Sequence, residues 1–149
     1  MTRRVLQNVT RRDLIAVLAG VLLLGSFAIP AFNGYVERSR VARAVSDIGT
    51  LSLQLYRWQK DTSTLPSSLA EAGLGADDPW GRPYVYRRAA GARQAELRKD
   101  DALEPLNSDF DLYSLGPDGE SALALPAAPS HDDVVRARNG AYIGLAVNY

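Results

Sequence analysis

The apolar pattern of the first sixty residues predicts one long helix with two different halves. Residues 14–32 form an uncharged run, LIAVLAGVLLLGSFAIPAF, in which Ser26 is the only polar side chain. A helix of this length spans roughly 28 Å, close to the hydrocarbon core of a bilayer. A buried core helix is rarely so long and so free of charge. A cleaved signal peptide needs a small-residue site, which Ala28-Ile29-Pro30 does not offer. The run therefore predicts a transmembrane segment.

The helical pattern continues as an amphipathic half over residues 33–61. Thr10 and Asp13 have the spacing of a capping box, which predicts the start of the helix there. Pro30 is predicted to lie inside the helix, because membrane helices tolerate proline. The apolar residues of the second half recur at spacings of three and four and form one stripe, which consists of Val41, Ala44, Val45, Ile48, Leu51 and Leu55.

Residues 62–149 have the composition of one small domain with short elements. A short helix is predicted over residues 65–72, and residues 121–130, which contain Pro126 and Pro129, are predicted to be irregular. Alternating or apolar runs predict strands at residues 84–88, 94–99, 110–115 and 141–147.

Charge and composition limit the function further. Arg3, Arg4, Arg11 and Arg12 precede the apolar run, so residues 1–13 form a basic leader-like segment that stays in the cytoplasm while the remainder is exported. The net charge is zero, and the part after residue 13 is acidic, so no nucleic-acid partner is expected. The absence of cysteine excludes disulfides and thiol chemistry, and the single histidine argues against a zinc site or a serine–histidine–aspartate triad.

Two sequence blocks follow the helix in a recognisable order. They are Asp78-Pro79-Trp80-Gly81 and Ser114-Leu115-Gly116-Pro117-Asp118-Gly119. With the basic leader and the long helix, they make the chain similar to type IV pilin-like proteins, in particular to the major pseudopilins of type II secretion systems. The resemblance implies an α+β fold, in which a long N-terminal helix packs on a small antiparallel β-sheet in the shape of a lollipop.

The resemblance also implies a function without catalysis. Pseudopilins polymerise through their N-terminal helices into a periplasmic filament. Their partners are other pseudopilins, the inner-membrane assembly platform and the prepilin peptidase of the secretion system. The chain would then be a single-pass protein of the bacterial inner membrane, with a cytoplasmic N-terminus and a periplasmic C-terminal domain.

Processing and assembly residues follow from the same resemblance. If Pro30 is the family's helix proline, Asp13 stands where the family has a glutamate and Asn8 where it has the glycine before the cleavage site. Val9 would become the new, methylated N-terminus. Asp13 would pair with the free amino terminus of a neighbouring subunit, and the alternative is that it only caps its own helix.

A calcium site is expected in the acidic loop. Calcium takes six to eight oxygen ligands, which combine carboxylates with backbone carbonyls. Asp118, Asp132 and Asp133 supply carboxylates, and the resemblance implies backbone oxygens from Leu115 and Ser121. The alternatives are that these acids are simply solvated, or that the segment 121–130 separates Asp132 and Asp133 from Asp118.

Other functions remain open at this level. The chain would serve as a type IV pilus or competence subunit, including a minor one, or as a lone membrane-anchored protein that binds a periplasmic partner. An anchored hydrolase that uses paired aspartates is the weakest alternative, because the chain offers few other general bases.

Overall fold

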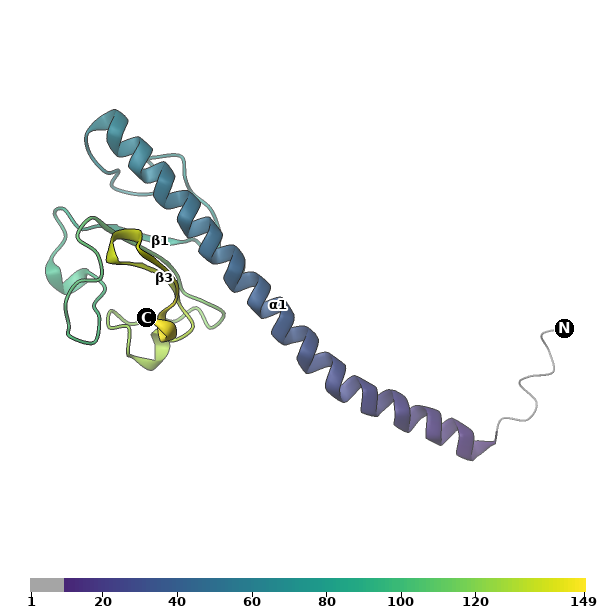
Figure 1. The fold of residues 1–149 in the computed structure, drawn as a ribbon. Helices are drawn as coiled ribbons and strands as arrows, with labels where there is room; N and C mark the ends of the chain where they lie inside the picture. Colours follow the sequence, from purple (N-terminus) through teal and green to yellow (C-terminus); the bar gives the residue numbers. More distant parts are fainter. Residues whose placement is uncertain (1–9) are drawn as a thin grey trace. The chain divides into compact units, whose positions relative to one another are not determined.

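A computed structural model describes residues 10–149, except for the side chains of Leu24, Gly25, Phe27, Ala28 and Gln94. The chain divides into two compact units, Met1–Arg38 and Ser39–Tyr149. One helix, α1 (Arg11–Thr62), contributes to both units (Figure 1). It contains Pro30 and ends where the sequence predicted, and Ser63 follows it with a φ of 66°.

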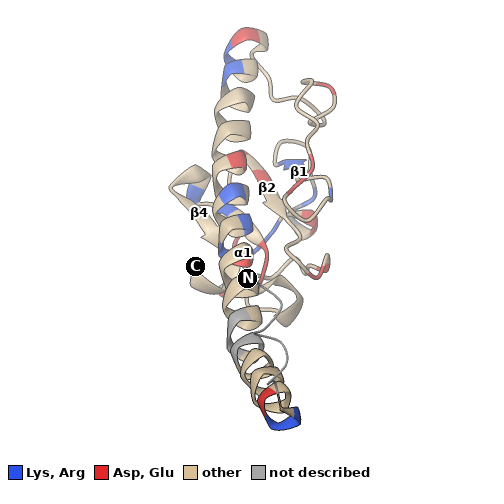
Figure 2. Cartoon of the chain, turned by 90° about the vertical axis from the view of Figure 1, so that its right-hand side faces the viewer, with Lys and Arg blue, Asp and Glu red and all other residues tan. Residues whose placement is uncertain are grey.

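The first unit is the N-terminal part of α1. Its described large apolar side chains between Leu14 and Phe32 are each exposed over at least 60% of their surface. The described residues of this stretch carry no charge (Figure 2). Among the helices of the part of the chain that the structure describes, none is long and apolar enough to qualify as a membrane span. The predicted transmembrane half at residues 14–32 is therefore not confirmed.

The second unit is built on four antiparallel strands in the order β1-β2-β3-β4. The strands are β1 (Val85–Arg88), β2 (Phe110–Ser114), β3 (Val134–Ala137) and β4 (Tyr142–Leu145). Tyr113 of β2 faces Val85 on one side and Val135 on the other, and Val135 in turn faces Gly144. Each strand is therefore paired with its neighbour along the chain.

The predicted stripe of α1 packs on one face of this sheet. Ile48 and Leu55 are fully buried, and they share a core with Phe110 and Leu112 of β2 and Val134 of β3. This packing confirms the α+β prediction of a long helix on a small antiparallel sheet. The helix is held there by apolar burial, since the buried positions recur at helical spacing and the exposed ones lie between them.

The opposite face of the sheet carries a second, smaller core that no α-helix of the described residues covers. Val135 and Ala137 of β3 pack there with Leu106 and Leu125 from irregular segments and with Ala146, which begins the 3₁₀ turn Ala146–Asn148. Side chains alternate between the faces of a strand, so β2 and β3 are buried on both sides. Among the described residues, loops and short 3₁₀ turns close this side of the domain.

Two predicted elements are wrong. Residues 67–72 form bends and turns, not a helix, and the Glu71 carboxylate accepts hydrogen bonds from the backbone N–H and the hydroxyl of Ser67, each at 2.6 Å. Residues 94–99 are not a strand. They form the 3₁₀ turn Gln94–Glu96 and single bridges at Lys99, because β1 pairs with β2 instead.

The sequence also missed β3. Residues 134–137 contain a charged residue, Arg136, at a position that faces the helix, and the local pattern therefore does not read as a strand. The remaining predictions for this region hold, since β1, β2 and β4 fall within predicted strands. Residues 121–130 are irregular apart from a single bridge from Ala124 to Lys99 and the short turn Ala128–Ser130.

The contact between α1 and the sheet predicts a large difference between two substitutions on the same helix. Ile48→Ala opens a cavity at a fully buried position and should lower the free energy of unfolding by about 2–5 kcal/mol. Leu53→Ala changes a side chain that is 62% exposed and should have little effect. Thermal melting of the purified chain measures both. Equal losses would contradict the packing of the stripe on the sheet.

Candidate functional site

The start of α1 has the predicted capping box. The backbone N–H and the hydroxyl of Thr10 both donate to Oδ2 of Asp13 at 2.8 Å, and the Asp13 N–H donates to the Thr10 hydroxyl at 3.3 Å. The two bonds from Thr10 hold the pKa of the Asp13 carboxyl below its ordinary value. Asp13 is exposed and is therefore a negative charge at the first turn of the helix.

The other residues predicted for assembly and processing are less informative. Pro30 lies inside α1, as expected. Asn8 and Val9 lie outside the described residues. The predicted roles of all four residues in cleavage and assembly stay predictions.

The two motif blocks lie against each other in the second unit. The Ser114 hydroxyl donates to Oδ2 of Asp78 at 2.5 Å, and Oδ1 of Asp78 accepts the backbone N–H groups of Trp80 and Arg82 at 3.0 Å each. The Arg82 guanidinium then donates to the carbonyl oxygens of Gly116 at 2.7 Å and Pro117 at 3.2 Å. The blocks are thus two halves of one hydrogen-bonded turn cluster.

Two glycines of the second block combine a left-handed backbone with a close approach that leaves no room for a Cβ. Gly116 has a φ of 63°, and a Cβ there would overlap the backbone carbonyl of Asp132. Gly119 has a φ of 74°, and a Cβ there would come within 2.6 Å of the Arg82 guanidinium. Both close approaches explain why this block needs glycine.

Two of the predicted calcium ligands come together beside this turn. Asp132 lies directly against Gly116, and its Oδ2 accepts the Asp118 N–H at 3.3 Å. Oδ1 of Asp118 accepts the Glu120 N–H at 2.8 Å. The carbonyl oxygen of Leu115 accepts the Gly119 N–H at 3.2 Å. The segment 121–130 has therefore not separated Asp132 from Asp118.

The third carboxylate is used differently. Asp133 is fully buried, and its Oδ2 accepts hydrogen bonds from the Arg98 guanidinium at 2.7 Å and from the Ser121 hydroxyl at 2.6 Å. Burial raises the pKa of Asp133, while the bonds from Ser121 and Arg98 oppose that rise. The side chains of two predicted ligands therefore bind an arginine and each other.

The predicted calcium ligands do not fit a metal ion as a set. Within the described residues, no group of three or more His, Cys, Asp or Glu side chains is placed to hold a metal. A calcium site with Asp133 requires an oxygen that lies beside a guanidinium, and like charges repel strongly when buried. Calcium binding stays a prediction that this geometry does not favour.

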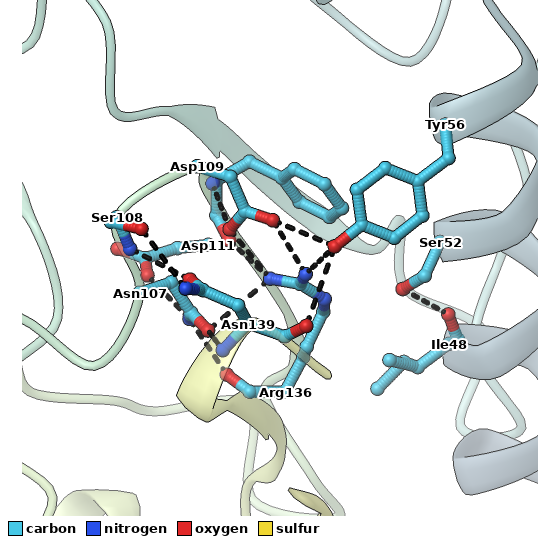
Figure 3. A network of polar contacts seen from close by, with 10 residues as sticks. Ile48, Ser52, Tyr56, Asn107, Ser108, Asp109, Asp111, Arg136 and Asn139 are labelled. Carbon is cyan, nitrogen blue, oxygen red and sulfur yellow. Dashed lines mark hydrogen bonds and ion pairs between the residues drawn. The ribbon is translucent and has the colours of Figure 1, made fainter. Parts of the chain in front are cut away.

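A second buried arginine joins the helix to the sheet (Figure 3). Arg136 of β3 is 1% exposed and forms a two-point ion pair with Asp109, at 2.9 Å from Nη1 to Oδ1 and 2.7 Å from Nη2 to Oδ2. Nη2 also donates to the Tyr56 hydroxyl of α1 at 2.6 Å. The guanidinium lies 4.0 Å from the centre of the Phe110 ring.

Amide side chains complete the network around Arg136 (Figure 3). Asn107 Nδ2 donates to the backbone oxygen of Arg136 at 2.9 Å and to Asp111 at 3.0 Å, and Asn107 Oδ1 accepts the N–H of Asn139 at 2.9 Å. Asn139 Oδ1 accepts the N–H of Ser108 at 2.8 Å. The turn after β3 is thereby fixed to the segment before β2.

The sequence analysis missed both buried arginines. The available signal was an arginine between buried apolar positions, Val134-Val135-Arg136-Ala137, with Asp109 just before an apolar strand. A charge buried in this way needs a partner, and the nearest acidic residue of a neighbouring strand is a candidate. No such local signal marks Arg98.

Comparison with known proteins gives similarity over most of the chain. The chain is 30% identical over 122 residues to the type II secretion system core protein G of Dickeya chrysanthemi, and the match covers 74% of this chain and 76% of that protein. The chain is 28% identical over 134 residues to the type IV major fimbrial protein FimA of Dichelobacter nodosus, and the match covers 88% of this chain and 81% of that protein. The core protein G of Klebsiella pneumoniae is 28% identical over 123 residues, covering 74% and 84%. No family model and no solved structure matches the chain.

The close approach at Gly116 predicts a specific sensitivity. Gly73 has nearly the same φ, 67°, but a Cβ there meets nothing within 4 Å. Alanine at either position should cost about 1–2 kcal/mol for the left-handed backbone. Gly116→Ala should cost roughly 1–3 kcal/mol more, because the methyl group displaces Asp132. Chemical denaturation of the two variants checks this, and equal losses would show that Gly116 does not touch Asp132.

The Asp109–Arg136 pair predicts a pH dependence of stability. Burial raises the pKa of Asp109, but hydrogen bonds from Arg136, the Phe110 N–H and Tyr56 outweigh it and hold that pKa below its ordinary value. A lowered pKa in the folded state stabilises the fold above about pH 4, and the contribution is lost as the pH falls through the folded pKa.

Asp109→Asn should therefore destabilise the chain by about 3 kcal/mol at neutral pH, because Arg136 is left buried without its counter-ion. Glu96→Gln is the matched control, since Glu96 pairs with Arg87 on the surface and such pairs contribute about 0–1 kcal/mol. Melting temperatures measured from pH 7 to pH 2 should show the difference between wild type and Asp109→Asn shrinking on acidification. A difference independent of pH would contradict the ion pair.

Proposed function

The chain belongs to the pilin-like family of the type II secretion system core protein G, and we propose that it polymerises through its N-terminal helix into the periplasmic filament of such a system. Like its relatives, it is a structural subunit of the pilin type and not an enzyme. The other components of the secretion system are its proposed partners. These are further pseudopilins, the inner-membrane assembly platform and the prepilin peptidase.

The exposed apolar surface of α1 carries this proposal. Successive residues of a helix are separated by about 100°, so the exposed side chains from Leu14 to Phe32 point around most of its circumference. Exposure of such an apolar surface to water is unfavourable, so the surface needs lipid or other protein to cover it. Small residues in the same stretch, such as Ala16, Ala19 and Gly20, allow close approach of a second helix.

Lipid is the proposed first environment of this surface. The arginines before the run, including Arg11 and Arg12, favour retention of the N-terminus in the cytoplasm. The chain is then a single-pass protein of the bacterial inner membrane, and its C-terminal domain lies in the periplasm. The uncharged stretch between Asp13 and Glu37 supports this assignment.

Asp13 is the proposed assembly residue. Its lowered pKa keeps it ionised, and both hydrogen bonds from Thr10 fall on Oδ2. A charge at the membrane boundary attracts a free amino terminus on an adjacent subunit, which cleavage between Asn8 and Val9 would create. Salt screens such a pair, so the attraction is greatest where lipid or neighbouring subunits exclude water from it.

A filament-assembly experiment distinguishes two roles of Asp13, as a pairing charge between subunits and as a cap of its own helix. Asp13→Ala should abolish incorporation into filaments in cells that lack the wild-type chain, because the pairing charge is gone. Thr10→Ala is the matched control, because it removes one hydrogen bond to Oδ2 and leaves the carboxylate. Filaments isolated from the cells and membrane fractions from the same cultures measure incorporation and anchoring separately.

Each outcome of this experiment has a definite meaning. Loss of filaments with Asp13→Ala alone, with both variants still in the inner membrane, supports the proposal. Equal loss with both variants would mean that only the helix cap matters. Recovery of wild type in the soluble fraction would overturn membrane anchoring.

A type IV pilus subunit is the second candidate. The similarity to the fimbrial protein covers 88% of this chain, a larger share than that to either core protein G. Deletion of the gene separates the two, because the proposed function predicts loss of protein secretion with surface pili intact. Loss of pili with secretion intact would favour the pilus.

A further inference from the structure

The far face of the sheet, away from α1, is organised around one buried cation. The Arg98 side chain is 2% exposed, and its guanidinium lies 4.3 Å from the centre of the Tyr113 ring. Nη1 donates to Oδ2 of Asp133 at 2.7 Å and to the Ser121 hydroxyl at 2.5 Å. Oδ2 of Asp133 also accepts from Ser121, so the three groups form a closed triangle.

The triangle joins three stretches of chain that belong to no helix or strand. Arg98 lies after the turn 94–96, Ser121 lies in the loop after β2, and Asp133 precedes β3. Backbone bonds run beside it, from Lys99 N–H to the Leu123 oxygen at 2.8 Å and from Leu125 N–H to the Lys99 oxygen at 2.9 Å. The Arg98 N–H donates to Asp111 of β2 at 2.8 Å. Arg98 thus links the loops to each other and to the sheet.

We propose that the Arg98 guanidinium takes the place of a metal ion in this loop cluster, so that the loops of residues 97–133 are held in place without calcium. A bound cation would neutralise Asp133 and draw the loop of Ser121 to it, and the guanidinium does both. The guanidinium is part of the chain itself, so this cation is present at any calcium concentration.

The positive charge of Arg98 beside Asp133 disfavours the binding of a second cation there. Oδ1 of Asp133 is buried and has no hydrogen-bond partner among the described residues, so it is the oxygen that a metal would bind. A divalent ion there would lie across one carboxylate from the guanidinium, and the two positive charges would repel in a poorly solvated site. Asp118 and Asp132 remain near the surface, but no third acidic side chain of the described residues is placed to complete a metal site with them.

The inference is independent of the proposed function, because it concerns the internal stability of the second unit in any assembly. A failure of filament assembly leaves it intact, and a calcium-dependent domain would leave the filament proposal intact.

Thermal melting of the full chain in detergent tests the inference. Calcium chloride in excess and then the chelator EGTA are the probes. The expected result for wild type is the same melting temperature in both. A metal that binds only the folded state raises the melting temperature by several degrees at saturating concentration, and such a rise in wild type would overturn the inference.

Variants of Arg98 test the role of the guanidinium itself. Arg98→Met keeps the apolar stem, leaves Asp133 buried without a counter-ion, and should lower the melting temperature by several degrees. Arg87→Met is the matched control, because Arg87 pairs with Glu96 on the surface at 2.9 Å, and it should change the melting temperature little. Similar melting of Arg98→Met and wild type would overturn the inference.

A double variant separates the charge from simple loss of packing. Arg98→Met with Asp133→Leu removes both charges and should recover most of the lost melting temperature, since an apolar pair substitutes well for a buried ion pair. No recovery in the double variant would argue against the ion pair. If Arg98→Met does not fold, the double variant and the calcium titration of the wild type still test the inference.

Discussion

Apolar burial holds α1 on the sheet, and the buried guanidinium of Arg136 adds a constraint on how the two fit together. The guanidinium pairs with Asp109 before β2, reaches the Tyr56 hydroxyl of α1, and lies over the Phe110 ring. A charge buried to this degree is tolerated only when its partners are in place. The helix, the segment before β2 and the strand β3 must therefore adopt their positions together, and this requirement selects one docking of α1 among those that apolar packing alone would allow.

The two faces of the sheet repeat the same chemical solution. Each face carries one buried arginine that lies over an aromatic ring and pairs with an aspartate, Arg136 with Asp109 on the helix side and Arg98 with Asp133 on the loop side. Within residues 10–149, no α-helix covers the loop side, and the chain has no cysteine to tie its loops. A guanidinium binds several oxygens in fixed directions, which suits it to fixing irregular segments.

Local patterns predicted the parts of the fold that depend on local periodicity. The capping box at Thr10, the buried stripe around Ile48 and the alternation in β2 are each encoded within a few turns or residues. The pairing of Asp133 with Arg98 joins residues 35 positions apart, and no periodicity reports it. The acidic cluster therefore resembled a calcium site in sequence, whereas in the structure one of its acids, Asp133, pairs with Arg98.

Self-association of α1 is the central functional claim, and cross-linking between copies tests it most directly. The chain contains no cysteine, so a single introduced cysteine reports only contacts between different copies. Leu18→Cys lies in the exposed apolar stretch of α1, and Leu123→Cys lies on an exposed loop of the second unit. On oxidation in native membranes, we expect covalent dimers from Leu18→Cys at much higher yield than from Leu123→Cys. Monomers alone from Leu18→Cys, in a chain that is expressed and folded, would contradict it.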